Sequence, residues 1–393
     1  MKRHQWHLFI PVLMLGILLL DACSFSIEVM SPAATSEVLP TPTFTQFVPE
    51  IYTPTVTPPV PTEAFLLPTP TLITIRDGTF YLLENFLNVR QKEIVHELAF
   101  SPDGAFLAST GGQSENFDIY IWDVATGQQI TALTGHTDNV WDLAFSPDGQ
   151  LLASVSSDRT AKIWDWRTRA LLKSLEFPGE VASVRFSPDG QSLAVGGVDE
   201  PLNQIRNAAI WTFAVGSWEP LLKYPEYWNI LTLNYSPNGS TLVGGGTSRN
   251  VQVWSVGDTN PIFTLSHAHQ VGKAAISPDG SILATSTCET VINQECTDGG
   301  FWLWDLPSGR LIRKVSGFPN IVVDLAFTSD GSTLLAGSRD GTLRFYATSD
   351  YEPRFETSSP DGISAMALSP DSGLLATGEF DGEVHLWKNV YHP

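Results

Sequence analysis

Short apolar runs, each ending at a turn signal, recur along most of the chain. The clearest is VWDLAF at residues 140–145, which has the apolar character of a buried strand. It is followed by Ser-Pro-Asp-Gly, in which Pro and Asp favour the centre of a tight turn and Gly supplies a positive φ. Three further strand-length runs extend to residue 177. The pattern predicts four antiparallel strands.

The same turn recurs seven times, which indicates a repeat architecture. Complete copies begin at Ser101, Ser146, Ser187 and Ser277, and variants begin at Ser236, Thr328 and Ser369. The copies start 41 to 51 residues apart, a period typical of four-stranded repeats. One such sheet cannot bury its own faces, so we expect seven of them to stack radially into a closed β-propeller.

The third strand of each copy ends in an aromatic residue. These residues are Trp122, Trp164, Trp211, Trp254, Trp304, Tyr346 and Trp387. Through YIWDV, KIWDW, AIWTF, QVWSV, WLWDL, RFYAT and HLWKN, the chain from about residue 95 to residue 389 resembles the WD40 repeat family. The resemblance implies an all-β, seven-bladed propeller.

In that family the Trp joins a hydrogen-bonded set of side chains inside the blade, which is structural and not catalytic. The resemblance implies that the second copy holds His136, Ser156 (with Ser154 as the alternative), Asp158 and Trp164. The fifth copy matches through His267, Ser286, Asp298 and Trp304. The remaining copies lack at least one member and are expected to rely on packing.

The last copy has no fourth strand before the chain reaches residue 393, whereas strand-like sequence precedes the first copy at residues 72–89. In the WD40 family an N-terminal strand completes the last blade. We therefore expect residues 72–393 to form one monomeric propeller whose N-terminal strand removes the two exposed edges.

The first residues predict export. A basic start, MKRHQWH, precedes 13 apolar residues at 8–20, a length that suits a signal-peptide core better than a membrane span. Residues 20–23, LDAC, resemble the lipobox of bacterial lipoproteins, although Asp21 departs from it. We expect a signal peptide at 1–22, a lipid on Cys23 and a membrane-anchored location outside the cytoplasm. The alternative is an ordinary secretory signal and a secreted protein.

Residues 23–71 are predicted to be a disordered linker. Ten Pro and ten Thr lie between residues 31 and 71, and such a segment cannot pair into a sheet or form a helix. It is expected to hold the propeller away from a membrane. The formal net charge of −20 disfavours nucleic acid as a partner, so the lipid anchor is the only membrane contact predicted.

Copies one, three and five are longer than the others by 3, 6 and 9 residues between their second and third strands. Insertions confined to one face of a repeat ring are typical of a binding side, although drift in tolerant loops is equally consistent with the pattern. The fifth insertion contains Cys288 and Cys296, which can form a disulfide outside the cytoplasm. The candidate partner-binding residues are Trp141, Glu200, Tyr227, Trp228 and Glu289.

Four charged residues occupy one equivalent position near the channel mouth: Glu97, Asp142, Lys273 and Asp324. Pairing with neighbouring blades is the expected role, and a bound cation is the alternative. No metal or cofactor is predicted. The chain has no GxSxG, HExxH, P-loop or dinucleotide motif. We therefore predict a non-catalytic protein-interaction scaffold. The alternatives are a receptor for a glycan or small ligand and, less favoured, a propeller hydrolase or lyase.

Overall fold

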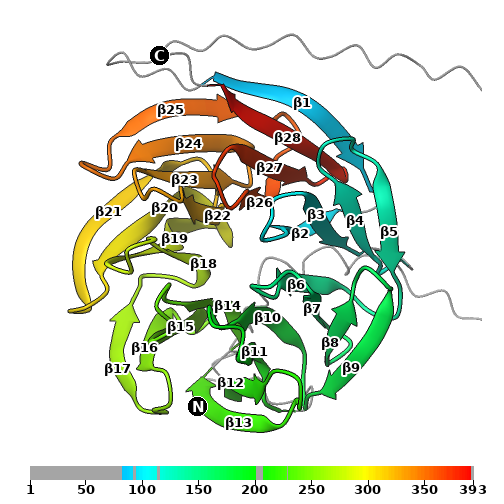
Figure 1. The fold of residues 1–393 in the computed structure, drawn as a ribbon. Helices are drawn as coiled ribbons and strands as arrows, with labels where there is room; N and C mark the ends of the chain where they lie inside the picture. The colour runs from blue at the N-terminus through cyan, green and yellow to red at the C-terminus, as the bar shows by residue number, and fades with distance from the viewer. Residues whose placement is uncertain (1–81, 92–93, 113–115, 201–206, 228, 391–393) are drawn as a thin grey trace, which may run out of the picture. The chain divides into compact units, whose positions relative to one another are not determined.

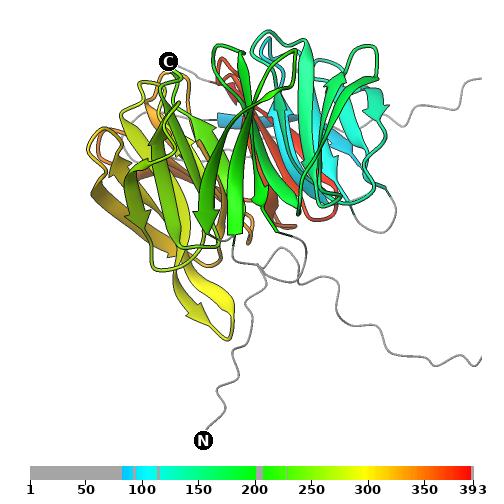
Figure 2. The same cartoon turned by 90° about the horizontal axis from the view of Figure 1, so that it is seen from below.

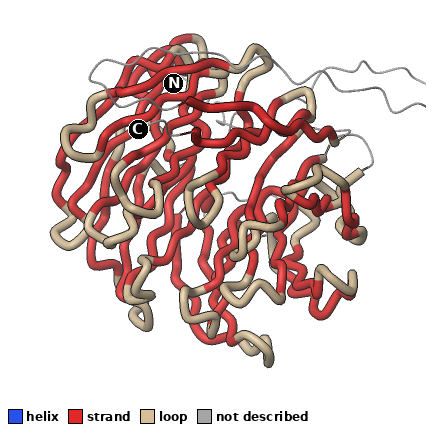
Figure 3. The backbone as a smooth tube through the Cα atoms, turned by 45° about the horizontal axis from the view of Figure 1, so that its top comes forward, coloured by secondary structure: helices blue, strands red, loops and turns tan. Residues whose placement is uncertain are grey.

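The computed structural model describes residues 82–91, 94–112, 116–200, 207–227 and 229–390. In these residues seven antiparallel sheets of four strands surround a central axis (Figure 1). Figure 3 shows only strands and loops there, with no helix. The predicted all-β, seven-bladed propeller is confirmed. The predicted signal peptide, Cys23 and the linker lie outside the described residues.

Each blade is numbered from its innermost strand outward. Blades 1 to 3 comprise β2 (Val95–Phe100), β3 (Phe106–Gly111), β4 (Ile119–Asp123), β5 (Gln129–Leu133); β6 (Val140–Phe145), β7 (Leu151–Ser156), β8 (Thr160–Asp165), β9 (Ala170–Glu176); and β10 (Val181–Phe186), β11 (Ser192–Val198), β12 (Asn207–Ala214), β13 (Pro220–Tyr227). Blades 4 and 5 comprise β14 (Ile230–Tyr235), β15 (Thr241–Gly246), β16 (Asn250–Ser255), β17 (Pro261–Ser266); and β18 (Val271–Ile276), β19 (Ile282–Ile292), β20 (Glu295–Asp305), β21 (Arg310–Phe318). Blades 6 and 7 comprise β22 (Val322–Phe327), β23 (Thr333–Ser338), β24 (Thr342–Ala347), β25 (Pro353–Ser358); and β26 (Ile363–Leu368), β27 (Leu374–Glu379), β28 (Glu383–Val390), β1 (Leu82–Arg90).

The ring closes through β1, as the sequence predicts. This strand pairs antiparallel with β28, from Leu82 opposite Val390 to Arg90 opposite Glu383, and so becomes the outer strand of blade 7. Leu87 and Val89 of β1 pack in a cluster with Leu98 of blade 1 and Leu386 of blade 7. The two ends of the repeat array are therefore joined by both backbone pairing and apolar packing.

The repeated turn holds its own hydrogen bonds. In blade 2 the Gly149 N–H donates to the Ser146 carbonyl at 2.8 Å, and the Ser146 hydroxyl donates to Asp148 at 2.6 Å. Gly149 has φ = 67°, a conformation that favours glycine. The donated hydrogen bonds lower the pKa of Asp148 from its usual value. The motif recurs because each copy builds the same tight turn.

The core lies between neighbouring blades. Between blades 1 and 2, for example, Ile121, Val140, Leu152 and Trp164 form part of one buried cluster. Trp166 adds a second large ring and packs edge-on against Phe106 of blade 1. A blade thus buries both faces only when its neighbours are present, as expected for a repeat array.

One alignment from the sequence is wrong. Leu152 pairs with Trp164 in blade 2, whereas the equivalent Leu193 of blade 3 pairs with Phe213 and not with Trp211. Phe213 lies two positions after Trp211, so the insertion in blade 3 is two residues longer than the sequence indicates. Trp211 is instead partly buried beside Phe177, with their ring centroids 4.9 Å apart.

Candidate functional site

The two faces of the ring carry different connections. Because each sheet is antiparallel, the Ser-Pro-Asp-Gly turns lie at one face and the connections between second and third strands lie at the other. We call the second face the loop face. The longest of these connections belong to blades 1 and 3, whereas in blade 5 the extra residues lengthen β19 and β20 into a longer hairpin. Figure 2 shows that the β19–β20 hairpin of blade 5, in yellow, extends beyond the other sheets.

The projecting part of this hairpin, residues 288–298, is called the arm. It contains a disulfide between Cys288 and Cys296. Asn293 and Gln294 at its tip have φ of 51° and 71°, typical of the tight turn that matches the twist of a hairpin. Ile292 beside them is 55% exposed. The arm therefore presents one apolar side chain on a cross-linked support.

The base of the arm is fixed by aromatic contacts. The Trp302 indole N–H donates to Glu289, and His267 stacks on Trp302 with ring centroids 4.8 Å apart. Lys314 Nζ lies 3.4 Å from the centroid of the Trp302 ring. Glu289 thus helps to hold the base of the arm in place, and its role in binding a partner stays a prediction.

Two other candidate contact residues, Trp141 and Glu200, also make contacts within the propeller. Trp141 is half-buried, stacks on His96 with centroids 4.7 Å apart, and donates its indole N–H to Ser157 at 2.7 Å. Glu200 accepts a hydrogen bond from Asn207. Trp228 and the side chain of Tyr227 lie outside what the structure describes.

Inside blade 2, the predicted set of polar side chains is present, but its hydroxyl belongs to Ser154. His136 Nδ1 lies 2.7 Å from Asp158 Oδ2, and His136 Nε2 lies 2.8 Å from Ser154 Oγ. Trp164 donates its indole N–H to the same Ser154 oxygen at 2.9 Å. Ser156 instead donates to the Asp138 carbonyl at 2.9 Å.

This set resembles a Ser-His-Asp triad in connectivity only. Ser154 is completely buried, and its oxygen accepts the Trp164 N–H, so no substrate carbonyl can reach it. Burial lowers the pKa of His136. Burial alone would raise the pKa of Asp158, but hydrogen bonds from His136 and Thr160 hold it well below its usual range. The set is structural.

Blade 5 needs a similar correction. Its hydroxyl is that of Thr285, whose Oγ1 lies 2.7 Å from His267 Nε2 and accepts the Trp304 indole N–H at 3.0 Å. Ser286 instead accepts the Lys273 backbone N–H, and Asp298 accepts the Gly317 N–H. His267 Nδ1 faces the Leu265 carbonyl in place of a carboxylate.

Blade 1 contains a set that sequence reasoning missed. Trp122 donates its indole N–H to Ser109 at 2.9 Å, and Ser109 donates to Gln91 Oε1 at 2.7 Å. Gln91 takes the place of His136, four residues before the innermost strand. A search for His alone could not find it.

Blade 4 lacks the hydroxyl, which leads to a prediction. Gly244 stands where Ser154 stands in blade 2, and the buried Trp254 indole N–H has no partner. We expect Trp164→Phe to cost about 0.5–1.5 kcal/mol more than Trp254→Phe, because only the first breaks a hydrogen bond, the one that the indole donates to Ser154. Urea unfolding of both variants measures the difference. Equal costs would show that packing alone determines the role of each Trp.

Charged side chains of the innermost strands meet around the central axis. Lys273 of blade 5 forms an ion pair with Glu97 of blade 1, across the ring from it. Arg185 pairs with Asp142 of the preceding blade at 2.7 Å, and Asp324 accepts the Met366 N–H at 2.9 Å. The prediction of neighbour pairing is therefore wrong for Glu97 and Lys273. Burial raises the pKa of Glu97 to about 7, against the attraction of Lys273.

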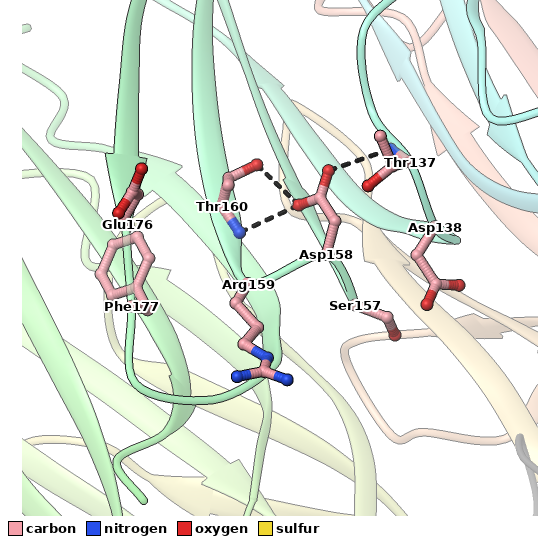
Figure 4. Close-up of a pocket in the computed structure, with 8 residues that line it drawn as sticks. All are labelled: Thr137, Asp138, Ser157, Asp158, Arg159, Thr160, Glu176 and Phe177. Atoms are coloured by element: carbon pink, nitrogen blue, oxygen red, sulfur yellow. Dashed lines mark hydrogen bonds between the residues drawn. The ribbon is translucent and has the colours of Figure 1, made fainter. Parts of the chain in front are cut away.

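A shallow polar pocket opens beside the blade 2 set (Figure 4). It has a volume of about 510 Å³ and is lined by Thr137, Asp138, Ser157, Asp158, Arg159, Thr160, Glu176 and Phe177. Asp158 already accepts hydrogen bonds from Thr137 N–H and from both donors of Thr160. A ligand in the pocket would therefore meet the side chains of Arg159, Asp138 and Glu176, because the Asp158 carboxylate is already hydrogen-bonded.

Within the described residues there is no helix of the length and apolarity that crossing a membrane requires. Nor does this part of the chain bring together three or more His, Cys, Asp or Glu side chains in a way that could hold a metal ion.

Comparison with known proteins identifies the family. The WD40 family, described as WD domain, G-beta repeat, matches residues 87–123, 127–165, 170–200, 218–255, 309–346 and 352–388. These stretches make up more than half of the chain, so the chain belongs to the WD40 repeat family. The longest unmatched stretch between them, residues 256–308, includes the arm.

Three relatives illustrate the similarity. Protein ROOT INITIATION DEFECTIVE 3 of Arabidopsis thaliana is 26% identical over 58% of this chain and 53% of its own length. THO complex subunit 3 of the same plant is 26% identical over 63% of this chain and 75% of its own length. Serine-threonine kinase receptor-associated protein of Gallus gallus is 25% identical over 75% and 80%. The chain thus spans only about half the length of the first of these relatives.

Proposed function

We propose that this protein is a non-catalytic interaction platform that binds a protein partner through its loop face. The observation that carries the proposal is the arm, a disulfide-linked hairpin that projects from the blade with the longest insertion. An exposed aliphatic side chain on a rigid support suits a partner's pocket, because little side-chain freedom is lost on binding. The names of two relatives, a complex subunit and a receptor-associated protein, are consistent with it.

We further propose that the platform is tethered to a membrane outside the cytoplasm through Cys23. This proposal rests on residues 1–23 and on the Pro- and Thr-rich stretch after them. The three relatives named above come from eukaryotes, so the bacterial type of leader is supported by this chain's own sequence alone. The disulfide agrees with a location outside the cytoplasm.

The tether gives a direct prediction. In a bacterial host fed a labelled fatty acid, the wild-type chain should take up label and sediment with membranes, because a diacylated Cys inserts into a bilayer. Cys23→Ala should lose the label and leave the membrane fraction, whereas Cys296→Ser should keep both. Equal labelling of wild type and Cys23→Ala would contradict the assignment of Cys23.

The platform is tested by comparing captured proteins between two variants. In one, residues 290–297 are replaced by a two-residue Asn-Gly turn; in the other, Leu172→Asp changes an exposed residue of β9, away from the arm. We expect a protein that wild type and Leu172→Asp retain and the shortened variant loses. Retention that is independent of the arm would contradict the proposal, and no retained protein would favour a small ligand in the polar pocket.

A further inference from the structure

We propose that His385 is a pH-sensitive latch that holds the closing strand β1 on blade 7 and loosens as the pH rises. The proposal is independent of the partner and of the membrane tether. It concerns the one seam of the ring that joins segments about 300 residues apart, Asn85 and Asn88 on β1 with His385 on β28.

The imidazole of His385 contacts groups on both sides of it. Nδ1 lies 2.8 Å from Asn88 Oδ1 and 3.1 Å from Asn85 Nδ2, both on β1. Nε2 lies 3.1 Å from Glu379 Oε1, at the end of β27. The side chain of His385 is only 15% exposed and that of Glu379 only 2%. One ring therefore bridges β1 to the inner part of its blade.

This arrangement fits a protonated ring. An imidazolium donates from both nitrogens, here to Asn88 Oδ1 and to Glu379 Oε1. Asn85 Oδ1 is buried without a partner, and turning this amide over would bring that oxygen toward the Nδ1 hydrogen. A neutral ring with its hydrogen on Nε2 keeps the bond to Glu379 and can accept from Asn85 Nδ2, but its Nδ1 lone pair then faces the Asn88 Oδ1 acceptor at 2.8 Å. A neutral ring with its hydrogen on Nδ1 keeps Asn88 and leaves Nε2 facing Glu379 Oε1 as a second acceptor. Only the protonated ring donates to Asn88 and Glu379 together, so the bridge to β1 is strongest with the second proton.

The surrounding charges favour that proton. Glu383 Oε2 lies 3.7 Å from His385 Nε2, and Asp381 precedes it in the same turn. The nearby cation, Arg90 of β1, is exposed and pairs with these two carboxylates at 3.5 and 3.6 Å. Burial lowers the pKa of His385, but the hydrogen bond and charge of Glu379, followed by the charges of Glu383 and Asp381, raise it above its usual value.

The direction of the pH effect follows from the raised pKa. A histidine whose pKa is higher in the folded than in the unfolded chain stabilises the fold fully below its ordinary pKa of about 6.5. That stabilisation is lost as the pH rises through the folded value. The loss is local, because the contacts of His385 lie within the blade that β1 completes. The backbone pairing of β1 remains, so the seam loosens without the ring unfolding.

Hydrogen exchange of the full chain between pH 6 and pH 9, corrected for the intrinsic rate, tests this inference. We expect protection of residues 82–90 to fall severalfold over this range, as the stabilisation that the protonated ring provides is lost. The outer strand β9 of blade 2 is the matched control and should not change. In each of the single variants His385→Gln and Asn88→Ala, the protection of β1 should be low at every pH. It should vary with pH no more than the protection of β9 does.

Two results would overturn the latch. One is that, in the wild type, the protection of β1 varies with pH no more than the protection of β9. The other is that the protection of β1 in the His385→Gln variant varies with pH as much as it does in the wild type. If that variant does not fold, the pKa of His385 is measured by NMR in the wild type instead. A value above about 6.5 is expected, and a value at or below it refutes the latch.

Discussion

Deleting the closing strand, residues 82–90, is expected to abolish the cooperative unfolding transition of the propeller. The deletion leaves the edge of β28 unpaired and exposes the cluster that Leu87 and Val89 share with Leu98 and Leu386. Each blade depends on its neighbours for burial, so the deletion weakens the core between blades 7 and 1 and leaves β28 with a free edge. Circular dichroism and differential scanning calorimetry, compared with the wild type, measure this loss.

The control for this deletion is addition of the missing strand as a separate peptide. A synthetic peptide with the sequence LLENFLNVR should restore a cooperative transition to the deletion variant, whereas a scrambled peptide of the same composition should not. A deletion variant that unfolds cooperatively at the wild-type temperature would show that β1 is not needed to close the ring.

The second large effect is expected in the central channel. Lys273→Met should destabilise the protein by about 3–5 kcal/mol, because it leaves the Glu97 carboxylate buried without its cation. Since burial already raises the pKa of Glu97, the variant should regain stability as the pH falls toward 5 and Glu97 takes up a proton. Urea unfolding at pH 5 and pH 8 measures both effects.

The double variant Lys273→Met, Glu97→Met is the matched control. Replacing both members of a buried ion pair with apolar residues of similar size is often nearly neutral, so we expect its stability to lie within about 1 kcal/mol of the wild type. Additive destabilisation in the double variant would show that the two side chains do not act as a pair.

The sequence predicts the blades well because each repeats its own local signals. The turn at Ser146 recurs at a nearly constant distance before the second strand, so strand order follows from spacing. Closure of the ring by an N-terminal strand is implied by the resemblance to the WD40 family. The sequence predicts the third blade less well, because Ala209, Trp211 and Phe213 occupy every second position of β12 and so share one face of the strand. Only the pairing of Phe213 with Leu193 shows which of them takes the Trp position.

The polar sets are harder to predict than the strands. Ser154 and Ser156 project from the same face of β7, because side chains on a strand alternate with a period of two. The choice between them depends on where the Trp164 indole lies across the sheet. Glu97 and Lys273 meet although 176 residues separate them, since their contact depends on the curvature of the closed ring. Neither fact is present in local sequence.

Site-specific photo-crosslinking in the protein's own cells tests the role of the loop face most directly. A photoreactive residue replaces either Ile292 at the tip of the arm or Ile130 on β5, which are 55% and 45% exposed. Ile130 lies at the start of the outer strand of blade 1, on the side of the Ser-Pro-Asp-Gly turns. We predict a discrete protein adduct from position 292 and none from position 130. An adduct from position 130 alone, or none from either, would contradict the proposed binding face.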